Sequence, residues 1–438
     1  METDPTRICE LLVGLPEVTV IGVVDHGDGP MEVHIEQAGG RPACLGCGGA
    51  PVVKERDVVS LVDLPAFGRP TRLVWRKIRW RCPNSSCPMT SWTWSDPRIG
   101  APRQAMTDRA GRWVTEQVGR LGRPVAELSR ELGCDWHTVN DAVVAYGAPL
   151  VEDPDRIGAV AALGLDETLF NRRGPWRTQS WCTSIVDVGA GQVRLLDVVK
   201  GRSAAGPSSW LARRAPEWRA KVAYGVLDLS GPYRKTFDDM LPDAVQVADP
   251  FHLVKLANTK LDDCRRRVQN QTLGHRGRRD DPLYRARRLL TKAHERLDEA
   301  GDRRLRGLLD AGDPDGEVRT TWHAKEVVRS IYDIPDAELA DEFVTQLGTD
   351  LQDDSYPDEV RSLGRTIARW RRQIVAWHQA AVSNGPTEAM NNLIKRIKRI
   401  GFGFRSFLHY RIRVLLYAGR PNWALLPTVN PVDPAQIR

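Results

Sequence analysis

The chain has 438 residues, of which 41% are hydrophobic and 27% are charged. This composition is typical of a globular protein with roughly two to four domains, and it excludes a wholly disordered chain, a collagen and a small disulfide scaffold. The net charge is +7; no uncharged apolar run reaches the ~18 residues of a membrane span and no signal peptide is visible, so we expect a cytoplasmic protein without membrane contact.

Four of the eight cysteines form two close pairs near the N-terminus, Cys44 with Cys47 and Cys82 with Cys87. In a reducing cytosol two close pairs favour metal binding over disulfides, and four thiolates suit one tetrahedral, structural Zn²⁺. The alternative is four unrelated buried thiols. We expect a zinc-binding ribbon module over residues 1–102. Its expected strands cover residues 18–24, 32–37 and 71–81.

A helix-turn-helix pattern follows in residues 103–150. Thr107 is placed to cap a first helix, and residues 125–144 have the apolar spacing of two helices joined by a tight turn at Gly133. The second helix of such a unit enters a DNA major groove, whereas an ordinary αα-hairpin is the alternative. The residues expected near base edges are His137, Thr138 and Asn140 or Asp141.

The pattern then changes to alternating strands and helices. Strands are expected at residues 159–165, 181–188, 192–199, 221–227 and 244–248, and short helices at residues 208–215 and 232–240. Helix dominates from residue 251 to residue 379. Three of the strands end in an aspartate: Asp166, Asp228 and Asp249.

Carboxylates at the carboxyl ends of neighbouring strands lie where sheet folds place active sites, and two-metal phosphoryl transfer requires such a cluster. Glu388 is a candidate for a further acid, because Ser383 or Asn384 could cap a helix there and Pro386 suits its first turn. By spacing alone, the acids do not differ from aspartates that are common in loops.

Several of these stretches together resemble the bacterial insertion-sequence transposases of the ISL-three (ISL3) family. The similarity runs from about Cys44 to Leu416 and includes the cysteine ribbon and the helix-turn-helix. Its most specific stretch is residues 383–407, with Ala389 where relatives often carry glycine. The other matching stretches are residues 164–167, 227–233 and 248–255.

The resemblance implies a multidomain α+β protein whose RNase H-like α/β catalytic domain is interrupted by a helical insertion. It carries over Asp166, Asp228 and Glu388 as a DDE triad that binds two Mg²⁺ ions, with Mn²⁺ as a substitute. Asp249 and His252 resemble a (Cys/Asp)-x-x-His element with a supporting role, although His252 could equally be a packed core histidine. The implied segments are 157–260 and 381–420 for the catalytic domain, 261–380 for the insertion and 421–438 for a C-terminal tail.

The stretch between Glu388 and Asp433 is a basic segment that contains eight Lys or Arg and no acid. Such a run is typical of contact with phosphates, although it could also be a solvated face. Its expected DNA-binding residues are Lys395, Arg396, Lys398, Arg399 and Arg405. One of the tryptophans of the helical insertion, Trp322, Trp370 or Trp377, could stack on an unpaired base near the cleaved end.

We therefore expect a transposase that binds the terminal inverted repeats of an insertion sequence and cuts and joins double-stranded DNA, including target DNA. We expect it to act as a homo-oligomer, at least a dimer on DNA, and to be nucleoid-associated when bound. The alternatives are a transposase-derived, non-catalytic DNA-binding regulator and a host nuclease such as a junction resolvase. The three intact acids argue against the regulator.

Overall fold

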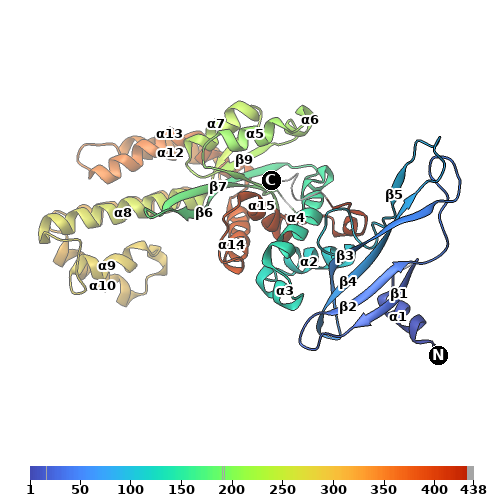
Figure 1. The fold of residues 1–438 in the computed structure, drawn as a ribbon. Coiled ribbons are helices and arrows are strands. Elements are labelled where there is room, and N and C mark those ends of the chain that lie inside the picture. Colours follow the sequence, from blue (N-terminus) through green and yellow to red (C-terminus); the bar gives the residue numbers. More distant parts are fainter. Residues whose placement is uncertain (16, 190, 192, 432–438) are drawn as a thin grey trace. The chain divides into compact units, whose positions relative to one another are not determined.

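The computed structural model describes residues 1–15, 17–189, 191 and 193–431. The chain divides into two compact units, one of Met1–Gly158 with Leu393–Arg438 and one of Ala159–Asn392. Figure 1 shows the helices and strands of both. Among the described helices, none is both long enough and apolar enough to cross a membrane.

The first unit opens with a helix and a five-stranded sheet in the order β1-β2-β4-β3, in which β5 pairs with β4 (blue in Figure 1). The elements are α1 (Pro5–Val13), β1 (Val18–Val24), β2 (Met31–Gln37), β3 (Val52–Ala66), β4 (Arg69–Arg81) and β5 (Ser91–Thr93). The three expected strands are confirmed as β1, β2 and β4. The sequence did not indicate β3, because residues 54–58 at its start are charged or exposed on both faces and break the alternation.

The helical part of the first unit contains the two expected helices joined by a tight turn. It contains α2 (Asp108–Gly119), α3 (Val125–Glu131), α4 (Trp136–Glu152), α15 (Phe407–Ala418), η1 (Pro154–Arg156) and η4 (Trp423–Thr428). Thr107 caps α2, and Gly133 turns the chain with a φ of 59° that favours glycine. The facing residues Leu128 of α3 and Val139 and Val143 of α4 are all buried, so the two helices share one core.

The second unit contains a five-stranded sheet in the order β10-β9-β6-β7-β8 (Figure 1). Its strands are β6 (Ala162–Arg173), β7 (Thr178–Asp187), β8 (Arg194–Lys200), β9 (Tyr224–Leu227) and β10 (Val245–Ala248). The first three are antiparallel neighbours, and β9 and β10 run parallel to β6. All five expected strands are present; residue 192, the expected start of β8, lies outside the described residues. One difference is that β6 continues seven residues past Asp166.

Helices cover both faces of this sheet. Cβ atoms built on Gly164 and Gly225 meet side chains of α14 and α7, respectively. Because Gly164 pairs with Val226 and Gly225 with Leu163, the two glycines point to opposite faces. The helices in and around this layer are α5 (Ala205–Ala212), α6 (Pro216–Arg219), α7 (Gly231–Met240) and α14 (Gly385–Ile400).

The expected helical stretch is confirmed as a series of helices between β10 and α14. They are α8 (Pro250–Leu273), α9 (Pro282–Thr291), η2 (His294–Arg296), α10 (Glu299–Gly312), α11 (Glu317–Ser330), η3 (Ile331–Asp333), α12 (Ala337–Asp350) and α13 (Asp358–Ala380). A core around Leu261, Leu305 and Trp322 holds α8 to α11 together. Trp322 and Trp370 are only 3% and 4% exposed, so neither is free to stack on a base.

Candidate active site and metal centre

Three aspartates lie in a row at one edge of the second unit's sheet. Leu165, Leu227 and Ala248 are paired side by side on β6, β9 and β10, and each is followed by an aspartate: Asp166, Asp228 and Asp249. Paired residues on neighbouring strands point to the same face, so Asp166 and Asp228 continue the face of Gly164. This is the face that α14 covers.

Asn391 of α14 and Asn384, which directly precedes α14, bond to this row of aspartates. The Asn391 side chain donates from Nδ2 to Asp166 Oδ2 at 2.7 Å and accepts from the Ser184 hydroxyl at 2.9 Å. The backbone N–H of Asn384 donates to Asp249 Oδ1 at 2.8 Å. Asn391 was not among the residues predicted from the sequence, although its position three residues after Glu388 places it on the same side of the helix.

The Asp228 carboxylate lacks the donors that a buried charge requires. Its Oδ1 is buried and has no hydrogen-bond partner. Burial raises the pKa of Asp228 to about 6, with further increases from the charges of Asp166 and Glu167, against the lowering effect of His252 and Lys255. Burial also raises the pKa of Asp166. Two carboxylates are thus held together where a cation would stabilise both.

His252 lies beside this pair and is held by Asp249. The distance from His252 Nδ1 to Asp249 Oδ2 is 3.1 Å, and Asp249 itself is buried. Burial lowers the pKa of His252, but the hydrogen bond to Asp249 and the charges of Asp166 and Asp228 outweigh it and raise the pKa. His252 is therefore a partner of the acids rather than an isolated core histidine.

Glu388 is exposed in the first turn of α14. Its backbone N–H donates to Asn384 O at 3.0 Å, which places it one turn after Asn384 and one turn before Asn391. Among the described residues, Asp166, Asp228 and Glu388 do not form a group whose ligand oxygens all lie within 4.8 Å of one another. Helical neighbours at i and i+3 are ~5–6 Å apart at Cβ, so Glu388 lies next to the side chain that bonds Asp166.

Gly164 allows α14 to approach the acids. A Cβ at Gly164 would lie 2.4 Å from Thr387 Oγ1 and 2.9 Å from Asn384 Oδ1. Gly164→Ala is expected to lower the free energy of unfolding by about 1–3 kcal/mol through overpacking, measured by urea unfolding. Gly307→Ala, on α10 where a Cβ would meet nothing within 4 Å, is the control and should be neutral or slightly stabilising. Equal stability of both variants would contradict the close packing of α14 on β6.

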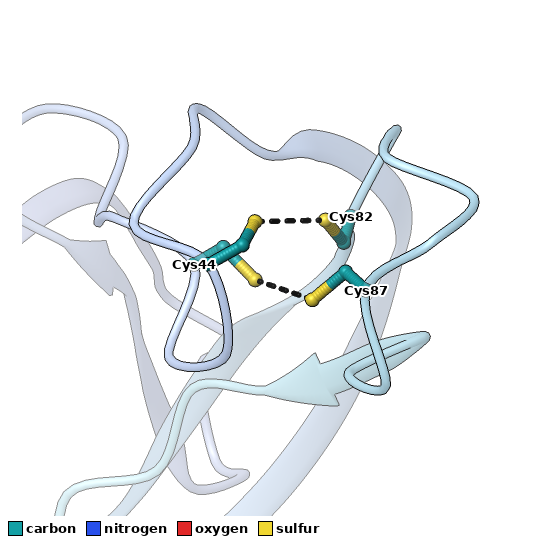
Figure 2. A group of neighbouring side chains, drawn as sticks. Cys44, Cys82 and Cys87 are labelled. Atoms are coloured by element: carbon teal, nitrogen blue, oxygen red, sulfur yellow. Dashed lines mark hydrogen bonds between the residues drawn. The ribbon is translucent and has the colours of Figure 1, made fainter.

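A separate metal-binding group lies in the first unit, where Cys44, Cys47, Cys82 and Cys87 gather with their sulfurs within 4.8 Å of one another (Figure 2). The Cys44–Cys87 and Cys47–Cys82 Sγ distances are 3.8 and 3.6 Å. These separations are far longer than the ~2.05 Å of a disulfide. They match the ~3.8 Å edge of a tetrahedron with metal–sulfur bonds of about 2.3 Å, so the four thiols could hold one metal ion.

The loop around the first cysteine pair stabilises a thiolate and allows the two cysteine loops to approach closely. Backbone N–H groups, chiefly that of Gly46, lower the pKa of the Cys44 thiol to about 7. A Cβ on Gly46 would lie 2.9 Å from Cys87 Sγ, so glycine is needed where the two loops meet. Cys44, Cys82 and Cys87 are buried and Cys47 is exposed. The two cysteine pairs that the sequence indicated as metal ligands therefore lie together in one compact group.

The candidate DNA-reading helix, α4, exposes some of the expected residues but not all. His137 is exposed, and the Thr138 hydroxyl donates to Asp135 Oδ2 at 2.8 Å as part of the helix cap. Asn140 is only 1% exposed, and its amide nitrogen lies 3.3 Å from His409 Nδ1 of α15. Asn140 is thus unavailable to a base edge, because α15 covers that side of α4, and we remove it from the expected contacts.

The basic segment is presented largely as expected. Lys395, Arg396 and Arg399 are exposed on the C-terminal half of α14, and Arg405 is exposed in the following turn. Lys398 is half-buried. The segment thus presents several cations on one helix and its following turn, in a stretch of sequence that contains no acid between Glu388 and Asp433.

The chain is similar to known transposases over most of its length. Residues 163–414 match the ISL3 family model, which is described as Transposase. The transposase for insertion sequence element IS1557 of Mycobacterium tuberculosis is 27% identical over 345 residues, covering 71% of this chain and 74% of that protein. The transposase for IS1001 of Bordetella parapertussis is 22% identical over 383 residues, covering 85% and 87%.

Among solved structures, the Drosophila P element transposase strand transfer complex aligns with 75% of this chain and 97% of its own. The TM-score is 0.39 and the sequence identity is 9%. Similarity at this level carries no argument about the fold.

Proposed function

The chain belongs to the ISL3 family of insertion-sequence transposases, and on that basis we propose that it binds terminal inverted repeats and cuts and joins DNA by two-metal phosphoryl transfer. The main support for the proposal is the Asp228 carboxylate. Its Oδ1 is buried without a hydrogen-bond donor, and the charge of Asp166 nearby repels it. An unpaired buried charge is costly, and a bound cation removes that cost. Carboxylate oxygens are the ligands that Mg²⁺ and Mn²⁺ prefer.

The residues of the site divide into metal ligands and residues that position them. Asp166 and Asp228 hold the metal from the strand ends, and Glu388 completes the ligand set from α14. Two Mg²⁺ ions held by these acids would polarise the scissile phosphate and activate the attacking water or 3′-hydroxyl. Asn391 fixes the orientation of the Asp166 carboxylate through its 2.7 Å hydrogen bond. Asp249 is a positioning residue, since both of its oxygens already bond to His252 and Asn384.

We also propose that the second unit is RNase H-like. The strand order β8-β7-β6-β9-β10 supports this, with three antiparallel strands followed by two that run parallel to β6. Helices on both faces of the sheet and acids at the ends of β9 and of the parallel part of β6 are further support. The helices α8–α13 form the insertion before α14.

The test of the function is a cleavage reaction on the element's own ends. The purified chain, mixed with DNA that carries both terminal repeats, should nick and join the DNA when Mg²⁺ or Mn²⁺ is added and should only bind it in Ca²⁺. We expect at least a dimer on the joined ends. Protein that binds the repeats but cleaves them with neither ion would contradict the catalytic proposal and favour a DNA-binding regulator.

For recognition of the repeats we propose the helix-turn-helix, with α4 in the major groove. His137→Ala is expected to lower affinity for the terminal repeat about tenfold and to relax the preference for one base, because a base contact contributes ~1–3 kcal/mol. Footprinting and gel-shift titrations measure both effects. His26→Ala, which removes another exposed histidine of the first unit, is the control. An unchanged footprint would make the cysteine module the better candidate for recognition.

A further inference from the structure

The β6–β7 hairpin projects beyond the sheet that carries the acids. β9 pairs with β6 only as far as Leu165, and β8 pairs with β7 only from Cys182 onward. The β6–β7 ladder nevertheless continues to the Arg173–Thr178 pair. Residues 171–173 and 178–180 therefore pair only with each other, and residues 172–179 are all exposed. We call residues 171–180 the ribbon.

The tip of the ribbon presents a tryptophan on a constrained turn. The Arg177 N–H donates to Gly174 O at 3.1 Å, which closes a four-residue turn with Pro175 in its second position. Proline fixes φ there, so the turn loses little conformational freedom on binding a partner. Trp176 is 91% exposed. An indole this exposed adds nothing to the protein core.

The charged residues of the ribbon itself are all basic. The ribbon carries Arg172, Arg173 and Arg177, and the sequence contains no acid between Glu167 and Asp187. Phe67 offers a comparison, since it is 88% exposed at the tip of the β3–β4 hairpin with a φ of 52°. The neighbouring Arg69, however, is paired with Asp25 at 2.6 Å. An aromatic tip among basic residues is suited to a polyanion with planar, stackable groups, which describes DNA.

We propose that the ribbon binds the DNA duplex beside the cleavage site, with arginines on the phosphates and Trp176 wedged against the bases. The proposal rests on the proposed function, which places the scissile phosphate at Asp166. Arg173 follows Asp166 by seven strand positions, and at ~3.3 Å per residue this spans about 23 Å. At ~3.4 Å per base pair, the tip contacts DNA about seven base pairs from the cut. An apolar wedge in the groove unstacks one base step there.

Duplexes carrying 2-aminopurine test the proposal directly. The fluorophore is placed singly at positions four to ten base pairs from the cut on either side, and the full chain is added in Ca²⁺ so that no cleavage occurs. Fluorescence should rise at one position near seven, and Trp176→Ala should abolish the rise and weaken binding about tenfold. Trp176→Phe should keep part of the signal, and the control Phe67→Ala should keep all of it.

The arginines are tested by salt dependence. Replacing Arg172 and Arg177 together by Gln should reduce the slope of log affinity against log salt by about two. If Trp176→Ala binds and unstacks DNA like the wild type, the inference is overturned. The same holds if the substitution changes only the oligomeric state, since the tip would then contact another protein chain. A chain that shows this signal but does not cleave in Mg²⁺ would instead contradict the proposed function.

Discussion

Asp228→Asn is expected to reduce strand cleavage by about 10³-fold or more while DNA binding persists. The substitution is nearly isosteric and removes the charge of one of two neighbouring carboxylates, Asp166 and Asp228. Their mutual repulsion favours binding of a cation between them. Loss of a metal ligand removes several kcal/mol of transition-state stabilisation, and ~4 kcal/mol corresponds to about 10³-fold in rate. We expect binding to depend instead on Lys and Arg contacts elsewhere in the chain. Cleavage of terminal-repeat DNA in Mg²⁺ and gel shifts on the same preparation measure the two effects.

Glu388→Gln and Glu167→Gln form a matched pair for identifying the third acid. Glu167 follows Asp166 on β6 and therefore points to the opposite face, although its charge still raises the pKa of Asp228. We expect Glu388→Gln to lose activity as Asp228→Asn does and Glu167→Gln to remain active. The reverse result would assign the third ligand to Glu167. Near wild-type cleavage by Asp228→Asn would refute the two-metal site altogether.

The row of aspartates could be predicted from the sequence, because a short local pattern marks the strand that each aspartate follows. Short apolar runs that end in aspartate predict strands ending at one edge, and the structure confirms these strands in register. The extent of β6 could not be predicted this way. Its residues beyond Asp166 are held by pairing with β7 alone, and their polar sequence, Asn171-Arg172-Arg173, has no core-facing alternation.

Contacts between distant segments explain what the sequence could not provide. Asn391 bonds to Asp166 across 225 positions, and Asn140 lies near His409 across 269. Helical periodicity identifies a face, but only packing decides which element covers it. On α4 the face carrying Asn140 is covered by α15, so a residue expected to be exposed is buried. On α14 the face carrying Asn391 reaches the acids, so a residue not selected becomes part of the site.

Cys82→Ser is expected to release the metal that we propose to be zinc and to unfold the loops that hold it. In small modules a structural zinc contributes on the order of 10 kcal/mol, because the site forms only on folding. Here the cluster joins the 44–49 loop to the end of β4, through Cys82, and to the 82–90 loop. The sheet core around Ile35, Leu73 and Trp75 lies outside the cysteine cluster, so we expect local rather than global unfolding.

Metal analysis of the purified chain should find one zinc per chain in the wild type and well under half an equivalent in Cys82→Ser. Limited proteolysis should then cut residues 38–50 and 82–90, while the second unit stays resistant. Cys9→Ser removes a half-buried cysteine outside the cluster and should retain both the zinc and the protection. A Cys82→Ser variant with full zinc content would mean that the metal lies elsewhere. Normal resistance to proteolysis without zinc would mean that packing of the surrounding residues holds the loops. The sulfurs themselves could not hold them, because thiols 3.6–3.8 Å apart without a metal make only weak contacts.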